Sequence, residues 1–336
     1  MSPILLRAPA VVLLLGALSA GCGDDGPPPP DVAPPPARLS GTPTYDARQE
    51  PAEAVLPLVP ATATTLTVTD LDAVRVQLGV PDMTSDDLVT DREEFWQRAA
   101  TEAPLLTDGL LRPDNSELML DYGFTEDDVD WEAHFTGDQG AGWVLAFRPD
   151  LDMAPVASAV KAGVGVLAGG HVQGHLVSFG TATDGADSWA TDPAFVGLLG
   201  APAEATYVHR GCLPFADALG PGATQEDQDR VTEHEDVTDL DPLDAVVLEF
   251  GDHLATVRMP VHRLDLFDRL HVGDWWPRDG SPAFEDGFRQ GVGDPATGRI
   301  GYVVPHPPLA AELALGETLP FGICNSVEPI AEPTGL

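Results

Sequence analysis

Two histidines, His171 and His175, have a four-residue spacing that could bind a metal ion. On a helix this spacing places both imidazoles on one face, which suits zinc. Gly169 and Gly170 precede the pair and Gly174 interrupts it, and this pattern favours an extended segment. On a strand the two rings would lie about 13 Å apart, too far to share an ion. We therefore expect strand residues and no metal site here.

A second candidate is the acidic segment 225–244, which has no apolar periodicity. Its carboxylates include Glu233, Glu235, Asp236 and Asp239, and carboxylate oxygens are the ligands that calcium prefers. A dedicated calcium loop alternates its acids and has a Gly at the sharp turn, whereas this segment has no Gly. We therefore expect a solvated loop, with weak calcium binding as the alternative.

Two adjacent tryptophans, Trp275 and Trp276, lie between Asp274 and Arg278 in an expected loop. An exposed Trp in such polar surroundings could stack on a sugar ring or on a side chain of another protein. Neighbouring side chains point in different directions, however, so the alternative is that one Trp anchors the loop in the core.

Motifs for covalent or phosphoryl chemistry are absent from the sequence. It contains no G-x-S-x-G nucleophile motif and no glycine pattern that binds phosphate. A triad of Asp, His and Ser that only folding brings together stays open. We assign no catalytic residue and expect no cofactor.

The N-terminus carries a targeting signal. Arg7 precedes the apolar residues 8–18, a stretch shorter than the roughly 20 residues of a transmembrane helix. The small residues 19–21 follow, and then Cys22. This order resembles the signal peptide of bacterial lipoproteins, although Ser19 stands where that family usually has Leu. The resemblance implies cleavage before Cys22 and an acyl lipid such as palmitate on its thiol. Cleavage by an ordinary signal peptidase, which accepts A-x-A-like sites, is the alternative.

After the signal peptide 1–21, residues 22–50 are expected to form a disordered tether. Positions 23–50 contain eight prolines and no apolar periodicity, so the segment cannot bury enough surface to offset its ordering entropy. As a polyproline helix of about 3.1 Å per residue it would reach roughly 90 Å. Signal and tether together predict a folded body held at the outer face of the cell membrane by its lipid.

The charge balance limits the partners of this body. There are 54 Asp and Glu residues against 17 Lys and Arg, which gives a net charge of −37. Nucleic-acid binding needs clustered Lys and Arg, so a nucleic-acid partner is not expected. Anionic lipid headgroups are repelled as well, and the acyl chains alone are expected to make the membrane contact.

Two further cysteines, Cys212 and Cys324, remain once Cys22 is assigned to the lipid. Thiols of an exported protein normally pair, and a disulfide between these two is therefore expected. It would close a loop of just over 100 residues and contribute roughly 4–5 kcal/mol in the chain-entropy model. Two free, buried cysteines are the alternative.

The elements that must position these residues alternate between hairpins and helices. Strands are expected at 62–69, 131–136, 142–148, 172–179, 205–209, 245–250, 254–261 and 299–304. Helices are expected at 71–78, 90–100, 116–122, 152–166, 193–199, 262–270 and 284–290. Hairpins followed by helices predict an α+β fold with antiparallel sheets.

Four parts follow the tether. Residues 51–220 are expected to form an α+β unit, 221–244 an acidic loop, 245–325 a second α+β unit packed on the first, and 326–336 a flexible tail. The order strand, strand, helix, strand occurs in both units. A duplication is one hypothesis that this order raises, although the two units share negligible sequence identity.

These features predict a membrane-anchored, extracytoplasmic lipoprotein with a non-enzymatic interaction or scaffold role. Signal, composition and distal cysteines resemble those of uncharacterised lipoproteins of high-GC Gram-positive bacteria, a resemblance that implies no activity. Two alternatives stay open. An extracytoplasmic hydrolase would need Asp, His and Ser clustered in a cleft. A lipoprotein that binds a solute or a divalent cation would need a pocket between the two halves or converging carboxylates.

Overall fold

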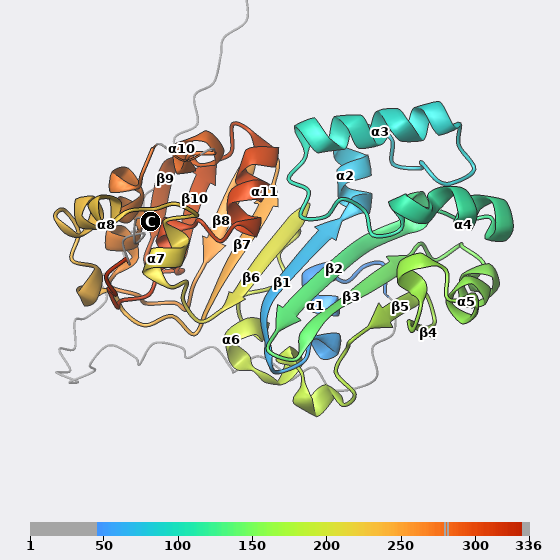
Figure 1. Ribbon diagram of the computed structural model, residues 1–336, viewed down its shortest axis with the longest axis horizontal. Helices are drawn as coiled ribbons and strands as arrows, with labels where there is room; N and C mark the ends of the chain where they lie inside the picture. The colour runs from blue at the N-terminus through green and yellow to red at the C-terminus, as the bar shows by residue number, and fades with distance from the viewer. Residues whose placement is uncertain (1–45, 279, 281, 331–336) are drawn as a thin grey trace, which may run out of the picture. The chain divides into compact units, whose positions relative to one another are not determined.

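The computed structural model describes residues 46–278, 280 and 282–330. The predicted signal peptide, Cys22, most of the tether and the last six residues lie outside this part. Ten strands form one antiparallel sheet in the order β4-β5-β3-β2-β1-β6-β7-β8-β10-β9 (Figure 1). The strands are β1 (Ala63–Asp70), β2 (Val129–Gly137), β3 (Gly140–Phe147), β4 (His171–Gln173), β5 (Leu176–Phe179), β6 (Ala205–Arg210), β7 (Ala245–Gly251), β8 (Leu254–Arg258), β9 (Arg289–Asp294) and β10 (Arg299–Val303).

Helices flank this sheet, and the predicted α+β fold is confirmed. They are α1 (Pro51–Ala54), α2 (Leu71–Gln77), α3 (Val89–Glu102), α4 (Asn115–Tyr122), α5 (Met153–Ala162), α6 (Pro193–Val196), α7 (Phe215–Ala218), α8 (Gln225–Thr232), α9 (Leu266–Val272), α10 (Phe284–Gly287) and α11 (Pro307–Leu315). Local sequence sets several of their ends. The Asp70 carboxylate caps α2, the Asp152 carboxylate caps α5, and Gly163 in the left-handed region ends α5.

Three apolar clusters cover the sheet. On one face, α1 and α6 pack over side chains such as Leu66 and Val68. On the opposite face, α2 to α5 pack over Leu145 and Phe147 at one end of the sheet. A separate cluster around Phe284 covers the other end of that face.

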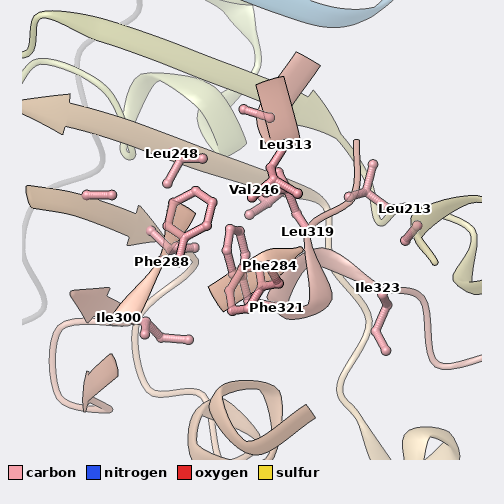
Figure 2. Close-up of a cluster of buried hydrophobic side chains, with 14 of the residues drawn as sticks. Leu213, Val246, Leu248, Phe284, Phe288, Ile300, Leu313, Leu319, Phe321 and Ile323 are labelled. Carbon is pink, nitrogen blue, oxygen red and sulfur yellow. The ribbon is translucent and has the colours of Figure 1, made fainter. Parts of the chain in front are cut away.

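The cluster around Phe284 joins α7 to α11 to strands β6, β7, β8 and β10. Figure 2 shows Phe284, Phe288 and Phe321 side by side within it. Their ring centroids lie 5.1–6.2 Å apart, and burial of each Phe contributes about 1.5–3 kcal/mol. These contacts anchor the helices of the C-terminal half to the sheet.

The disulfide that the sequence predicts is present. Cys212 and Cys324 are bonded, with their Cα atoms 4.8 Å apart. The backbone N–H of Cys324 also donates to the carbonyl of Leu213 at 2.8 Å, and that of Leu213 to the carbonyl of Gly322 at 2.8 Å. The bond therefore ties the chain after β6 to the segment that follows α11.

Several local predictions were wrong. The single strand expected at 172–179 is the hairpin β4–β5, because Gly174 turns the chain at φ +59. The helix expected at 284–290 ends at Gly287, and the chain continues as β9. The acidic segment 225–244, expected to be a loop, contains α8 and a short 3-10 helix, Val237–Asp239.

Helix α8 forms because its first turn is capped and its few apolar residues are buried. The hydroxyl of Thr224 accepts from the backbone of Asp227, and the Asp227 carboxylate accepts from the backbone of Thr224. Val231 is fully buried in the C-terminal core. The buried Gln228 also holds α8 in place, because its side chain donates to the carbonyl of Glu328 at 2.9 Å.

The sheet is continuous between the two units that the sequence suggested. Strand β6 pairs with β1 on one side and with β7 on the other. The first strand of the second half is therefore hydrogen-bonded directly to the last strand of the first half.

Candidate functional site

Polar side chains share one face at the centre of this sheet. In the β1–β2 register Thr65 lies opposite Thr136, and Thr67 opposite His134. In the β1–β6 register Thr67 lies opposite Tyr207. Directly opposite residues of antiparallel strands point to the same face. The central strands therefore present a polar strip, which we call the strand panel, on the face that bears the two separate helix clusters. Its members are Thr65, Thr67 and Thr69 of β1, Glu132, His134 and Thr136 of β2, and Tyr207 and His209 of β6.

The strand panel follows from a simple alternation in β1. Thr65, Thr67 and Thr69 alternate with Leu66 and Val68. Because successive side chains of a strand point to opposite faces, the valine and leucine enter the core under α1 while the threonines face the other way.

A groove of about 410 Å³ lies over the strand panel. One wall is the segment after α3, with Leu106, Thr107 and Asp108. The other wall is the end of α11, with Leu315 and Glu317. Helix α11 packs against α3, so the groove lies where the helices of the two halves meet (Figure 1).

Glu132 and His134 form a hydrogen-bonded pair at the bottom of the groove. The Glu132 side chain is fully buried, and its Oε1 binds Nε2 of His134 and accepts from the hydroxyl of Thr107. Its Oε2 accepts from the backbone N–H of Leu110 at 2.9 Å. Burial alone would raise the pKa of Glu132, but the bonds from His134 and Thr107 outweigh burial and lower it. Glu132 is therefore a carboxylate at neutral pH.

This pair leaves one imidazole nitrogen for the groove. The His134 side chain is 33% exposed and lines the groove. Because Nε2 binds Glu132, Nδ1 is the nitrogen that can meet a ligand or a water molecule. An imidazole oriented by a carboxylate is the arrangement of a general base.

A second carboxyl group, Glu126, is buried beside Glu132. Its Oε2 accepts from the backbone N–H of Leu111. Complete burial, and then the charge of Glu132, raise the pKa of Glu126 well above its ordinary value. Burial and the neighbouring carboxylate therefore both favour the neutral form of Glu126.

On the opposite wall, Glu317 is held in an unusual backbone conformation. Its φ is +57, in the left-handed region that non-glycine residues rarely adopt. The turn is fixed by the backbone N–H of Thr318, which donates to the carbonyl of Leu313 at 3.0 Å. Oε1 of Glu317 accepts from the hydroxyl of Tyr207 at 3.2 Å. Strained backbone of this kind concentrates at functional sites.

Tyr207 and His209 are uncharged neighbours of Glu317. Burial, and then the charge of Glu317, raise the pKa of Tyr207, so its phenol stays protonated and donates. Burial lowers the pKa of His209, although the charge of Glu317 opposes that shift. Within the described part of the chain no Lys or Arg lines the groove. Besides His134 and the neutral Tyr207, the ionisable groups on its lining are the carboxyl groups of Asp108 and Glu317, which favours a ligand with a positive charge.

The acidic residues suggested by the sequence are not brought together. Glu233 ends α8, and Asp236 uses its Oδ1 to accept from the backbone and hydroxyl of Thr238 at 3.2 and 2.6 Å. Glu235 is half-buried and Asp239 is exposed. In residues 46–278, 280 and 282–330, no group of three or more His, Cys, Asp or Glu side chains is arranged to hold a metal ion.

The two tryptophans have different environments. Trp276 is 5% exposed and packs on Phe215, with ring centroids 6.0 Å apart. Trp275 is 37% exposed and stacks on His234 at a centroid distance of 3.6 Å. Trp276 therefore anchors the loop in the core, and one face of Trp275 is already occupied by His234.

Sequence reasoning missed the residues of the groove. The available signal was the alternation of β2, in which Glu132, His134 and Thr136 occupy every second position and so share a face. Nothing in that alternation predicts that the same face meets β6 and the end of α11.

Within the described ranges, none of the helices has the length and apolarity needed to cross a bilayer. Comparisons with protein-family models, with curated proteins and with solved structures find no match to this chain.

Proposed function

We propose that this protein is a lipid-anchored, extracytoplasmic binding protein whose central groove holds a small polar solute with a positively charged group. The observation that carries this proposal is the convergence of acceptors from both halves of the chain on one groove. His134 and Asp108 come from the N-terminal half, and Glu317 comes from the C-terminal half. This is the pocket between the halves that solute binding requires.

The size and polarity of the groove support a small ligand. Its volume of about 410 Å³ is within the roughly 300–1,000 Å³ of small-molecule sites. The hydroxyls of Thr65, Thr67 and Thr136 on its floor can donate to or accept from hydroxyl or amide groups of the solute.

The charges of the groove support an ammonium or guanidinium group on that solute. Glu317 lines the groove, and the Glu132 carboxylate lies beneath His134. Asp108 also lines the groove, but it is exposed and water screens its charge. A cation about 4 Å from one carboxylate gains about 4 kcal/mol at an effective dielectric constant of 20. Loss of hydration offsets part of this gain.

The cellular location rests on the N-terminal sequence. The small residues before Cys22 and the Pro-rich segment after it support lipidation and a tether. The disulfide between Cys212 and Cys324 supports an oxidising compartment beyond the cytosol. A binding protein held at the outer face of a membrane would capture solutes there.

Calorimetry with three classes of small solute tests the proposal: ammonium compounds such as amino acids, diamines and betaines, neutral sugars, and dicarboxylates. Saturable one-site binding is expected for a member of the ammonium class. Glu317→Gln should weaken it at least tenfold, whereas the matched control Glu285→Gln on α10, 55% exposed, should leave it within twofold. Binding confined to dicarboxylates, or equal affinity in both variants, would contradict the proposal.

A second candidate function is hydrolysis, because the Glu132–His134 pair opens into the same groove. His134 would take a proton from a water molecule that attacks a bound ester or amide. A panel of activated esters and amides assayed with wild type and His134→Gln tests this role. Turnover that His134→Gln reduces at least a hundredfold would favour the enzyme. Equal turnover in both proteins would exclude His134 as the base.

A further inference from the structure

A second hollow, which we call the α3–α4 trough, has a volume of about 960 Å³. It runs between α3, α4 and the segment 108–113. Three of its lining side chains carry N–H donors: Arg92, Trp96 and Arg112. None of these three lines the groove over the strand panel, and Asp108 is the residue that both hollows share.

The buried carboxylate of Asp127 fixes two groups of the trough. Its Oδ1 accepts from the indole N–H of Trp96 at 2.9 Å, and its Oδ2 accepts from Arg92 at 2.8 Å. The Asp127 side chain is 2% exposed and that of Arg92 is 11% exposed. Arg92 and Trp96 are thereby held rigidly in place on α3.

Arg112 lies over the ring of Trp96. Its guanidinium carbon is 4.4 Å from the ring centroid, within the distance of a cation–π contact. One nitrogen donates to the backbone carbonyl of Asp108 at 2.9 Å. Arg112 forms no salt bridge with any carboxylate of the described residues, although acids outnumber bases 54 to 17 in the chain. Its remaining N–H donors are free to bind an anion.

Besides Asp127, two acidic residues, Glu93 and Asp108, also line the trough. Both are exposed, so water screens their charges. Neither forms a salt bridge with Arg112 within the described ranges. A guanidinium group binds a carboxylate through two parallel hydrogen bonds. Glu93 and Asp108 do not form this pair of bonds with Arg112, so a ligand carboxylate can form it.

Part of the remaining lining of the trough is apolar. Met119 and Leu120 of α4 and Val89 of α3 line it. Leu120 is 85% exposed and Val89 is 58% exposed. Large apolar side chains this exposed at the mouth of a hollow are typical of sites that bind apolar groups.

We propose that the α3–α4 trough is a second binding site, distinct from the central groove, for a small amphipathic carboxylate. Its carboxylate would bind the guanidinium of Arg112 in a bidentate fashion. Its short apolar chain would lie on Val89, Met119 and Leu120. Such a ligand matches both the unpaired cation and the exposed apolar surface, whereas a fully polar anion would leave that surface in water.

Titration calorimetry of the purified full chain with octanoate in about 0.15 M salt tests this proposal. Octanoate is expected to bind at one site. Arg112→Gln should weaken it at least tenfold, and Leu120→Ser at least threefold. Both side chains are exposed, so the variants should fold, and circular dichroism checks that they do. Two matched controls, Arg278→Gln (69% exposed) and Leu264→Ser (91% exposed), should leave the affinity within twofold.

Two further probes separate the parts of the ligand. Both are titrated into Glu317→Gln, which lacks the groove carboxylate, so that an ammonium group held in the central groove is not counted. Acetate, which has the carboxylate alone, and octylammonium, which has the chain with the opposite charge, should each bind this variant at least tenfold more weakly than octanoate does. The proposal is overturned if octanoate shows no saturable binding. It is also overturned if octylammonium binds Glu317→Gln as tightly as octanoate does, or if Arg112→Gln and Arg278→Gln have the same affinity for octanoate.

Discussion

The carboxylate of Glu132 binds Nε2 of His134, two residues further along the same strand. On a strand, residues two apart share a face, so the pair is built from one element and needs no long-range contact to form. The supports of Glu132 come from elsewhere, since Thr107 and Leu110 donate to it from the segment after α3. Glu132 therefore connects the segment after α3, which forms one wall of the groove, to the imidazole of His134. A shift of that wall would change the orientation of the imidazole.

Replacement of Glu126 should change how stability depends on pH. In wild type the pKa of Glu126 is raised in the folded state. Its stabilising contribution is complete below the unfolded-state pKa and is lost as the pH rises toward the folded-state pKa. Between these values stability falls by about 1.4 kcal/mol per pH unit. Glu126→Gln cannot titrate, so urea unfolding from pH 5 to 8 should show a smaller fall. An unchanged slope would mean that Glu126 is ionised in the native protein.

Glu317 should respond differently to Gly and to Ala. Its left-handed backbone favours glycine, so Glu317→Gly should be more stable than Glu317→Ala by about 1 kcal/mol. Both variants lack the carboxylate and should lose solute binding in the groove equally. Thermal unfolding and calorimetry measure the two effects. Equal stability of the variants would indicate that the backbone relaxes without cost.

Loss of the disulfide should be costly. The bond between Cys212 and Cys324 spans 112 residues, for which the chain-entropy model gives about 4–5 kcal/mol. Cys212→Ser combined with Cys324→Ser should lower the free energy of unfolding by about that amount in denaturant titrations. Wild type treated with a reductant is the matched control and should unfold at a similar midpoint. A decrease in the free energy of unfolding of less than about 1 kcal/mol would contradict the chain-entropy model for this disulfide.

Cys22 should carry the membrane anchor. Intact-mass measurement of the mature N-terminus is expected to show a diacylglyceryl addition on this residue. Cys22→Ser should release the protein from membranes while its circular dichroism spectrum is unchanged, because the residue precedes the folded body. A mature wild-type chain that begins elsewhere and carries no lipid would refute the anchor.

Much of the fold was predictable because its elements are locally consistent. The β-branched run 62–69 became β1, and residues 90–100 became α3, with Phe95, Trp96 and Ala99 buried on one side. The turn around 137–140 joined β2 to β3 as expected. In each case the periodicity of the sequence and its tertiary environment agree.

The missed elements depend on contacts from distant residues. Strand β9, Arg-Gln-Gly-Val-Gly-Asp, has few residues that favour a strand. It forms because β10 supplies its hydrogen bonds, and its pairing is irregular near Gln290, which adopts φ +53. The groove was missed for a related reason. Glu132, Tyr207 and Glu317 are far apart in sequence, and only the strand order and the end of α11 bring them together.

The unbroken sheet beneath the groove governs how a solute would enter and leave. Residues 65–69 of β1 are paired on both sides, with β2 and with β6. A protein that clamps its ligand between two lobes rotates a few backbone dihedrals between them, and such rotation here would break the hydrogen bonds of three strands. Exchange would therefore depend on side chains and short loops at the mouth, which move in nanoseconds to microseconds. Capture by this groove would be brief and readily reversed, as suits handover of a solute rather than its storage.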